Sequence, residues 1–121
     1  MTAKNDFLRK LFFDKIIVEI KMAVVYITCK GGKEAEKISR HLLEKKLIGC
    51  ANMFPIKSMF WWEGKIDECS ETVIIAKTLD YEKVKEEVKK IHSYSVPCVL
   101  KIEAEANPEY VEWLKEVIGF R

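Results

Sequence analysis

The sequence lacks several features that would assign it to a common functional class. Its apolar runs stay far below the ~20 residues that cross a bilayer, which predicts a soluble protein. No two of its four cysteines form a Cys-x-x-Cys pair, the spacing of zinc knuckles and thioredoxin-like sites. Nothing at the start resembles a secretory signal, so we expect a cytoplasmic protein with free thiols. Cys50 and Cys98 are then expected to pack as small buried hydrophobes.

An excess of one charge is also missing. Lys and Arg number 21 against 19 Asp and Glu, a formal net charge of +2. Acids and bases are interleaved, as over residues 83–90, which is typical of a solvated helix face rather than of a nucleic-acid surface. Of the 121 residues, 49% are hydrophobic, which is enough for the core of one domain. We therefore expect one globular domain that binds neither nucleic acid nor membrane.

Residues 1–21 differ in pattern from the rest of the chain. Their apolar residues come in short runs, broken by Lys10, Asp14 and Lys15. We predict an N-terminal extension here, followed by a domain of residues 22–121. The extension is either weakly ordered or contains a short amphipathic helix, with Ile16–Ile20 prolonging the first strand.

Hydrophobic periodicity predicts the order β-α-β-β-α-β followed by a further helix. The expected elements are a strand at 23–28, a helix at 33–47, a strand at 50–62, a returning strand that ends at 72–78, a helix at 80–91, a strand at 96–106 and a helix from 108. This order is the split βαβ of the ferredoxin-like α+β class, in which helices cover one face of an antiparallel sheet. The apolar open face of so small a chain then requires another subunit.

Single residues predict the boundaries of these elements. Gly49 is expected to end the first helix, and Pro55 predicts an edge strand or a bulge because proline cannot donate to a ladder. Glu63-Gly64-Lys65 is expected to form a tight hairpin turn. Strict alternation over 96–106 predicts one buried and one wet face. Both hairpin arms exceed the usual strand of ~5–6 residues, so the ribbon needs something to pair with.

Five separate blocks of the sequence carry a resemblance to one family. They are Leu43–Asn52, Trp61–Ile66, Lys77-Thr78, Ile91–Pro97 and Asn107–Leu114. Together, in this order and spacing, they strongly resemble the CutA family, and the resemblance covers about residues 22–118. It implies a ferredoxin-like homotrimer whose hairpin strands pair with those of neighbouring subunits. It also implies a role in divalent-cation tolerance and in the response to metal ions.

The resemblance further implies candidate ligands for copper or another divalent cation. The family's copper pattern has a Cys near the end of the first strand and two adjacent His after the second helix. Aligned to this sequence, the Cys position falls on Ile27, two residues before Cys29 on the same strand face, and the His pair reads Ile91-His92. We therefore take His92 and Cys29 as the candidate ligands, because imidazole and thiolate suit copper and zinc. Alternatively, His92 is a helix-terminal residue that favours the negative end of the dipole.

A second candidate site lies in the residues around the hairpin. Lys77 ends a β-branched run, where a buried charge is costly unless it is paired. With Trp62, Glu63 and Tyr94 it is expected to line an intersubunit pocket that binds an anion or a carboxylate, or to form an intersubunit salt bridge. Trp61 and Trp62 should face opposite sides of the ribbon and serve in core or interface packing.

No catalytic site is predicted. An acylphosphatase, the nearest enzyme of this fold class, needs an Arg in its phosphate loop, and residues 29–33 contain none. A metal chaperone of this class would carry Cys-x-x-Cys. A second reading is a trimeric PII-like module that binds a small molecule or scaffolds a protein, although the Glu63–Lys65 turn is too short for the nucleotide-binding loop of PII proteins.

Overall fold

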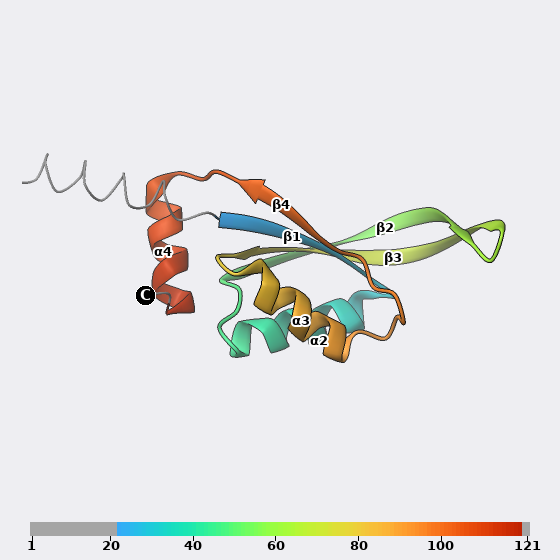
Figure 1. The fold of residues 1–121 in the computed structure, drawn as a ribbon, viewed down its shortest axis with the longest axis horizontal. Helices are drawn as coiled ribbons and strands as arrows, with labels where there is room; N and C mark the ends of the chain where they lie inside the picture. The colour runs from blue at the N-terminus through green and yellow to red at the C-terminus, as the bar shows by residue number, and fades with distance from the viewer. Residues whose placement is uncertain (1–21, 120–121) are drawn as a thin grey trace, which may run out of the picture.

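The computed structural model describes residues 22–119, so the extension predicted for residues 1–21 lies outside the described residues. Within them, three helices and a four-stranded antiparallel sheet follow in the predicted order (Figure 1). The elements are β1 (Met22–Cys29), α2 (Gly32–Glu44), β2 (Cys50–Trp62), β3 (Lys65–Thr78), α3 (Tyr81–Ile91), β4 (Val99–Ala104) and α4 (Pro108–Ile118). The strand order is β2-β3-β1-β4. None of the described helices is long and apolar enough to span a membrane.

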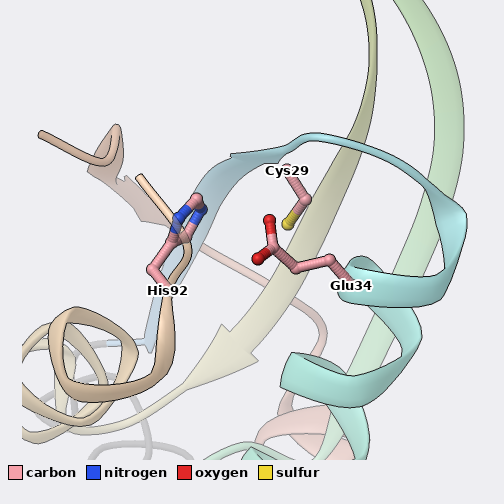
Figure 2. Close-up of side chains that lie close together, drawn as sticks. All are labelled: Cys29, Glu34 and His92. Atoms are coloured by element: carbon pink, nitrogen blue, oxygen red, sulfur yellow. The ribbon is translucent and has the colours of Figure 1, made fainter. Parts of the chain in front are cut away.

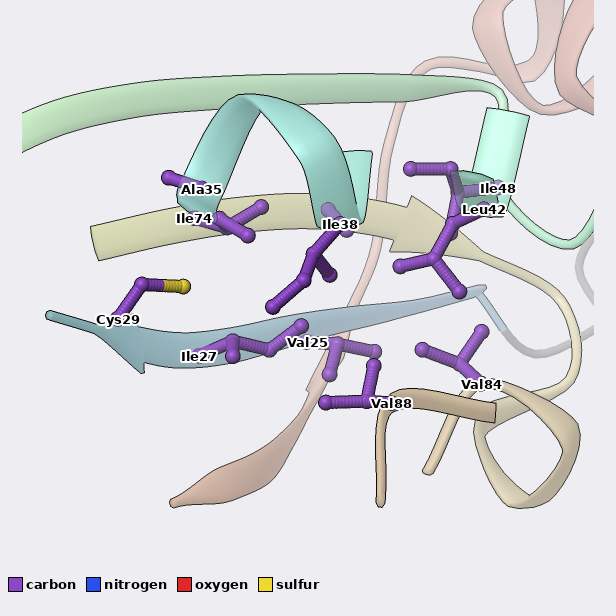
Figure 3. Packing of buried hydrophobic residues seen from close by; sticks show 11 residues of the cluster. Val25, Ile27, Cys29, Ala35, Ile38, Leu42, Ile48, Ile74, Val84 and Val88 are labelled. Carbon is purple, nitrogen blue, oxygen red and sulfur yellow. The ribbon is translucent and has the colours of Figure 1, made fainter. Parts of the chain in front are cut away.

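The hydrophobic core lies between one face of the sheet and two helices. α2 and α3 pack side by side on this face (Figure 1). Val25 pairs with Ala76 and Ile27 pairs with Ile74 across β1 and β3, and all four are fully buried. Figure 3 shows the helical side chains that meet the sheet, among them Ala35, Ile38, Leu42, Val84 and Val88. Their spacing along each helix is the apolar stripe that the periodicity predicted.

The opposite face of the sheet is much less covered. Tyr26 pairs with Leu100 on this face, and Leu100 and Ile102 each expose 50% of their surface. The predicted buried face of the last strand is therefore wrong for the single chain, because α2 and α3 pack on the other side. The strand is also shorter than predicted. It begins at Val99, after Pro97, which has no N–H to give to a ladder.

The β2–β3 hairpin extends well beyond the body of the domain (Figure 1). Its arms of 13 and 14 residues pair along their whole length, from Cys50 with Lys77 to Trp62 with Lys65. β1 pairs only with residues 72–78 of β3, so the distal part of the ribbon has only its own two strands. The turn has φ of 50° at Glu63 and 79° at Gly64. β2 is an edge strand, as Pro55 predicted.

The C-terminus of α2 differs from the prediction. The helix ends at Glu44, and Lys46 adopts a left-handed φ of 56°. Its N–H donates to the carbonyl of Leu43 at 3.0 Å, and the N–H of Leu47 donates to the carbonyl of Leu42 at 3.0 Å. These two bonds form a Schellman motif with lysine where glycine is usual. The stop signal expected at Gly49 is therefore not the one that ends the helix.

Gly49 instead provides room for α4. A Cβ atom at Gly49 would overlap Leu114 and lie 3.1 Å from Cγ2 of Val117. Leu114 is fully buried and Val111 nearly so, so the last helix docks on the start of β2 through this face. Asn107 and Pro108 begin α4 as predicted, although the side chain of Asn107 makes no capping hydrogen bond.

Candidate functional site

Three potential metal ligands converge at one end of the sheet (Figure 2). Cys29 is the last residue of β1, Glu34 lies in the first turn of α2, and His92 follows the last residue of α3. One ligand atom from each residue lies within 4.8 Å of the other two. The structure thus brings the two sequence-predicted ligands together and adds Glu34, which the sequence analysis missed.

Backbone hydrogen bonds hold Glu34 between two loops. Its Oε1 accepts from the N–H of Lys30 at 3.2 Å, and its Oε2 accepts from the N–H of Ser93 at 3.1 Å. Although desolvation opposes the effect, hydrogen bonds from Ser93 and Lys30 hold the pKa of the Glu34 carboxyl below its ordinary value. The carboxylate is therefore ionised and fixed beside the thiol. An acidic residue in the first helical turn after the Cys29 strand was the signal that could have revealed it.

Both ring nitrogens of His92 are engaged. Nε2 lies 2.8 Å from the carbonyl oxygen of Thr28, and Nδ1 accepts from the N–H of Tyr94 at 3.0 Å. Because a peptide N–H can only donate, Nδ1 is the acceptor and Nε2 carries the ring proton. His92 therefore joins the end of β1 to the loop that follows α3.

Cys29 is fully buried in the core cluster. Desolvation, followed by the negative charges of Glu34 and Glu71, raises the pKa of its thiol to about 12. The thiol therefore keeps its proton near neutral pH unless a cation replaces it. Ile27, the position that the resemblance aligns with the copper-binding Cys, is also fully buried on the same strand face and offers no ligand atom.

The three residues fit a thiophilic divalent cation by donor type and position. Thiolate, imidazole and carboxylate are ligands of copper and zinc, and three protein ligands leave a coordination position open. Each donor already has a role in the fold, however: the thiol of Cys29 is protonated and buried, and His92 and Glu34 accept or donate backbone hydrogen bonds. Cation binding must therefore expel one proton and break at least one of these bonds.

The intersubunit-pocket residues are not all together within one chain. Trp62 and Tyr94 line a shared cavity of about 650 Å³ along the distal part of the ribbon. Glu63 lies in the hairpin turn, beyond the cavity walls. Lys77 lies at the far end of β3, where its Nζ contacts Oδ1 of Asn52 and is 3.7 Å from Sγ of Cys50. The full cavity wall consists of Thr28, Ser58, Met59, Phe60, Trp62, Asp67, Cys69, Glu71, Tyr94, Ser95, Val96 and Cys98.

A buried carboxylate lies in this cavity wall. Glu71 is only 9% exposed, and its Oε2 accepts from the hydroxyl of Tyr94 at 2.8 Å. Desolvation and the hydrogen bond to Glu71 raise the pKa of the Tyr94 hydroxyl, which therefore stays a donor. Cys98 and Cys50 are half-buried rather than buried as expected, because Cys98 lines this cavity and Cys50 faces Lys77 across the strand pair.

Comparison with known proteins identifies close relatives along the whole described domain. The sequence model of CutA1 divalent ion tolerance protein matches residues 23–117. The chain is 46% identical over 97 residues to the divalent-cation tolerance protein CutA of Archaeoglobus fulgidus, which covers 78% of this chain and 95% of that protein. It is 35% identical over 100 residues to the mouse protein CutA, covering 79% of this chain and 56% of the mouse protein.

Solved structures agree with these relatives. A structure named as the periplasmic divalent cation tolerance protein CutA from Archaeoglobus fulgidus superposes with a TM-score of 0.78 at 45% identity, covering 80% of this chain and 98% of that one. CutA1 from Oryza sativa superposes with a TM-score of 0.77 at 34% identity, covering 81% and 94%. The likeness therefore extends from the sequence blocks to the fold.

Proposed function

Since the chain belongs to the CutA family of divalent-cation tolerance proteins, we propose that it binds a divalent cation through Cys29, Glu34 and His92. The observation that carries this proposal is the convergence of one sulfur, one nitrogen and one carboxylate oxygen within 4.8 Å. Copper or zinc fits this donor set best. The bound cation would neutralise the charge of Glu34 and take the place of the thiol proton.

Glu34 and Cys29 give the proposed site a fixed negative charge and a buried sulfur. Glu34 is fixed by two amide donors, so it offers a preorganised negative charge. Cys29 lies in an apolar environment that excludes water from the sulfur. We propose a binding role without catalysis, because the described site contains no activated nucleophile: the pKa of the Cys29 thiol is about 12.

We further propose that the chain is a ferredoxin-like homotrimer. The element order and the strand order β2-β3-β1-β4 support that fold class. The projecting ribbon exposes 67% of Met59, 73% of Trp61 and 64% of Ile66, a large apolar surface for a soluble chain. Pairing of this ribbon with neighbouring subunits would cover these side chains and complete its strand edges.

In such a trimer, residues of two neighbouring subunits would together form the predicted intersubunit pocket. Trp62 and Tyr94 share the cavity of one chain, whereas Lys77 is at the opposite end of its own β3. We therefore propose that Lys77 and Glu63 reach this cavity from a neighbouring subunit. There Lys77 would either bind an anionic ligand or pair with a carboxylate such as Glu71.

We also propose the domain boundaries of the chain and its cellular location. The family match over residues 23–117 supports a domain of residues 22–121 after an extension of residues 1–21. All four cysteines lie in the described residues and are free thiols, which favours a reducing, cytoplasmic environment.

Titration of Zn²⁺ and Cu²⁺ into the reduced protein, followed by calorimetry, tests the cation site. We expect Glu34→Gln and His92→Ala each to weaken binding by about tenfold or more, since each removes a ligand. Cys69→Ser is the matched control, because Cys69 is an exposed thiol on the ribbon outside the cluster. Equal affinity in wild type, Glu34→Gln and His92→Ala would disprove this site.

A further inference from the structure

Tyr94 connects the candidate cation site to the cavity along the ribbon. Its N–H donates to Nδ1 of His92 at 3.0 Å, and the two rings lie 4.8 Å apart. Its hydroxyl donates to Oε2 of Glu71 at 2.8 Å, inside the cavity wall. The position of the Tyr94 ring therefore depends at one end on the His92 ring and at the other on β3.

His92 has no ring nitrogen to spare for a cation. A cation on Nδ1 would displace the N–H of Tyr94, and a cation on Nε2 would leave the carbonyl of Thr28 without its donor. Glu34 differs from His92 here, because each of its carboxylate oxygens accepts one backbone N–H and keeps a lone pair for a cation. The bond to Thr28 joins the loop that begins at residue 92 to the end of β1, the bond from Ser93 joins it to α2, and the bond between Tyr94 and His92 lies within the loop. Ligation by His92 breaks the first or the last of these bonds and so loosens the loop.

We propose that cation binding at Cys29, Glu34 and His92 releases Tyr94 from Glu71 and so changes the cavity along the ribbon. This inference rests on the proposed cation site. The released state would present the carboxylate of Glu71, which is 9% exposed while Tyr94 covers it, to whatever occupies the cavity. Cation binding at one end of the sheet would thereby control a charged group at the base of the projecting hairpin.

The coupling must act in both directions. If cation binding breaks the contact between Tyr94 and Glu71, then that contact opposes cation binding by the same free energy. Removing the hydroxyl of Tyr94 should therefore make the cation bind more tightly. A purely structural role for Tyr94 predicts the reverse, because loss of a structural contact near the ligands would loosen the site.

The test is Zn²⁺ affinity in three forms of the full, reduced chain. We expect Tyr94→Phe to bind Zn²⁺ about two- to tenfold more tightly than wild type, the range that one net hydrogen bond supplies. Tyr81→Phe is the matched control, since the hydroxyl of Tyr81 donates to the carbonyl of Val99 at 2.7 Å and makes no contact with His92. It should bind Zn²⁺ with wild-type affinity.

Hydrogen exchange provides a second measurement. Zn²⁺ should speed exchange of the amides of residues 93–96 and 98 in the wild type, and leave those of α4, which carries none of the three ligands, unchanged. Unchanged or weakened Zn²⁺ affinity in Tyr94→Phe, or no change in exchange on Zn²⁺ binding, would overturn the coupling while the cation site stands. Zn²⁺ binding that does not depend on Glu34 and His92 would instead remove the site itself, and the coupling with it.

Discussion

Nε2 of His41 lies 2.7 Å from Oε1 of Glu87, and this contact joins α2 to α3 on the outer side of the core. Nζ of Lys45 lies 3.1 Å from the same oxygen, and Nζ of Lys90 lies 3.4 Å from the other. The carboxylate of Glu87 therefore contacts three basic side chains: His41 of α2, Lys45 at the C-cap of α2, and Lys90 of α3 itself. Interleaved charges on these helices indicated only a solvated surface, yet here they hold the two helices that cover the sheet.

The first prediction concerns acid stability. Hydrogen bonds from His41 and Lys45 lower the pKa of the Glu87 carboxyl from 4.5 to about 2. A carboxyl with a depressed folded-state pKa stabilises the fold above its unfolded value and loses that contribution as pH falls through the folded value. Glu87→Gln should therefore be less stable than wild type at neutral pH, and the difference should shrink between about pH 4.5 and pH 2.

Urea unfolding at several pH values checks this prediction. Glu86→Gln is a suitable control, because Glu86 is an exposed neighbour on the same helix. A stability difference between wild type and Glu87→Gln that stays constant down to pH 2 would contradict it.

The second prediction concerns the end of α2. Lys46 holds a φ of 56°, a conformation that costs a non-glycine residue about 1 kcal/mol. Lys46→Gly should therefore stabilise the protein by roughly 0.5–1 kcal/mol in thermal or urea unfolding. Glu44→Gly, two residues earlier in the last helical turn, should destabilise it by a similar amount. Loss of stability in Lys46→Gly would show that the lysine side chain contributes more than the backbone strain costs.

The third prediction concerns the docking of α4. Gly49→Ala should destabilise the protein by about 1–3 kcal/mol, the usual cost of overpacking, because its new methyl group overlaps Leu114. Gly32→Ala adds the same methyl group where no atom lies within 4 Å, so it should be neutral or slightly stabilising. In a double-mutant cycle, Leu114→Ala should relieve part of the cost of Gly49→Ala. Additive effects would count against direct contact between these two residues.

The fourth prediction concerns assembly. The chain has a mass of 14.1 kDa, and light scattering of the wild type should give about three times that value if the ribbon pairs with neighbouring subunits. Trp61→Asp should shift the protein toward smaller particles, because the exposed indole of Trp61 is then replaced by a charge in the interface. Lys89→Ala, on the exposed side of α3, should leave the mass unchanged. A wild-type particle of 14.1 kDa in dilute solution would rule out the trimer.

Much of the fold follows from local sequence signals. The two helices were predictable because Ala35, Ile38 and Leu42, like Val84 and Val88, recur at helical spacing. β2 was predictable as an edge strand from Pro55, whose missing N–H excludes a central position. The end of α2 was not, since a left-handed lysine at position 46 carries no sequence signal comparable to glycine.

Some residues of the candidate site could likewise be predicted from the sequence, and others could not. Cys29 and His92 could be named from the sequence, because a resemblance placed both near the family's ligands. Glu34 could not, because the distance from its carboxylate to the other two side chains depends on how α2 packs against β1. The hydrogen bonds of both ring nitrogens of His92 could not be predicted either, since their partners Thr28 and Tyr94 belong to different elements.

The sequence by itself determined the order of strands and helices, the family and the identity of two candidate ligands, because periodicity, turn residues and the order and spacing of motifs can be read along the chain. Only the tertiary structure decided that Gly49 makes room for Leu114, that Glu34 joins Cys29 and His92, and that Tyr94 links this cluster to Glu71. These contacts join residues far apart in sequence, and their distances are set by the packing of helices on the sheet.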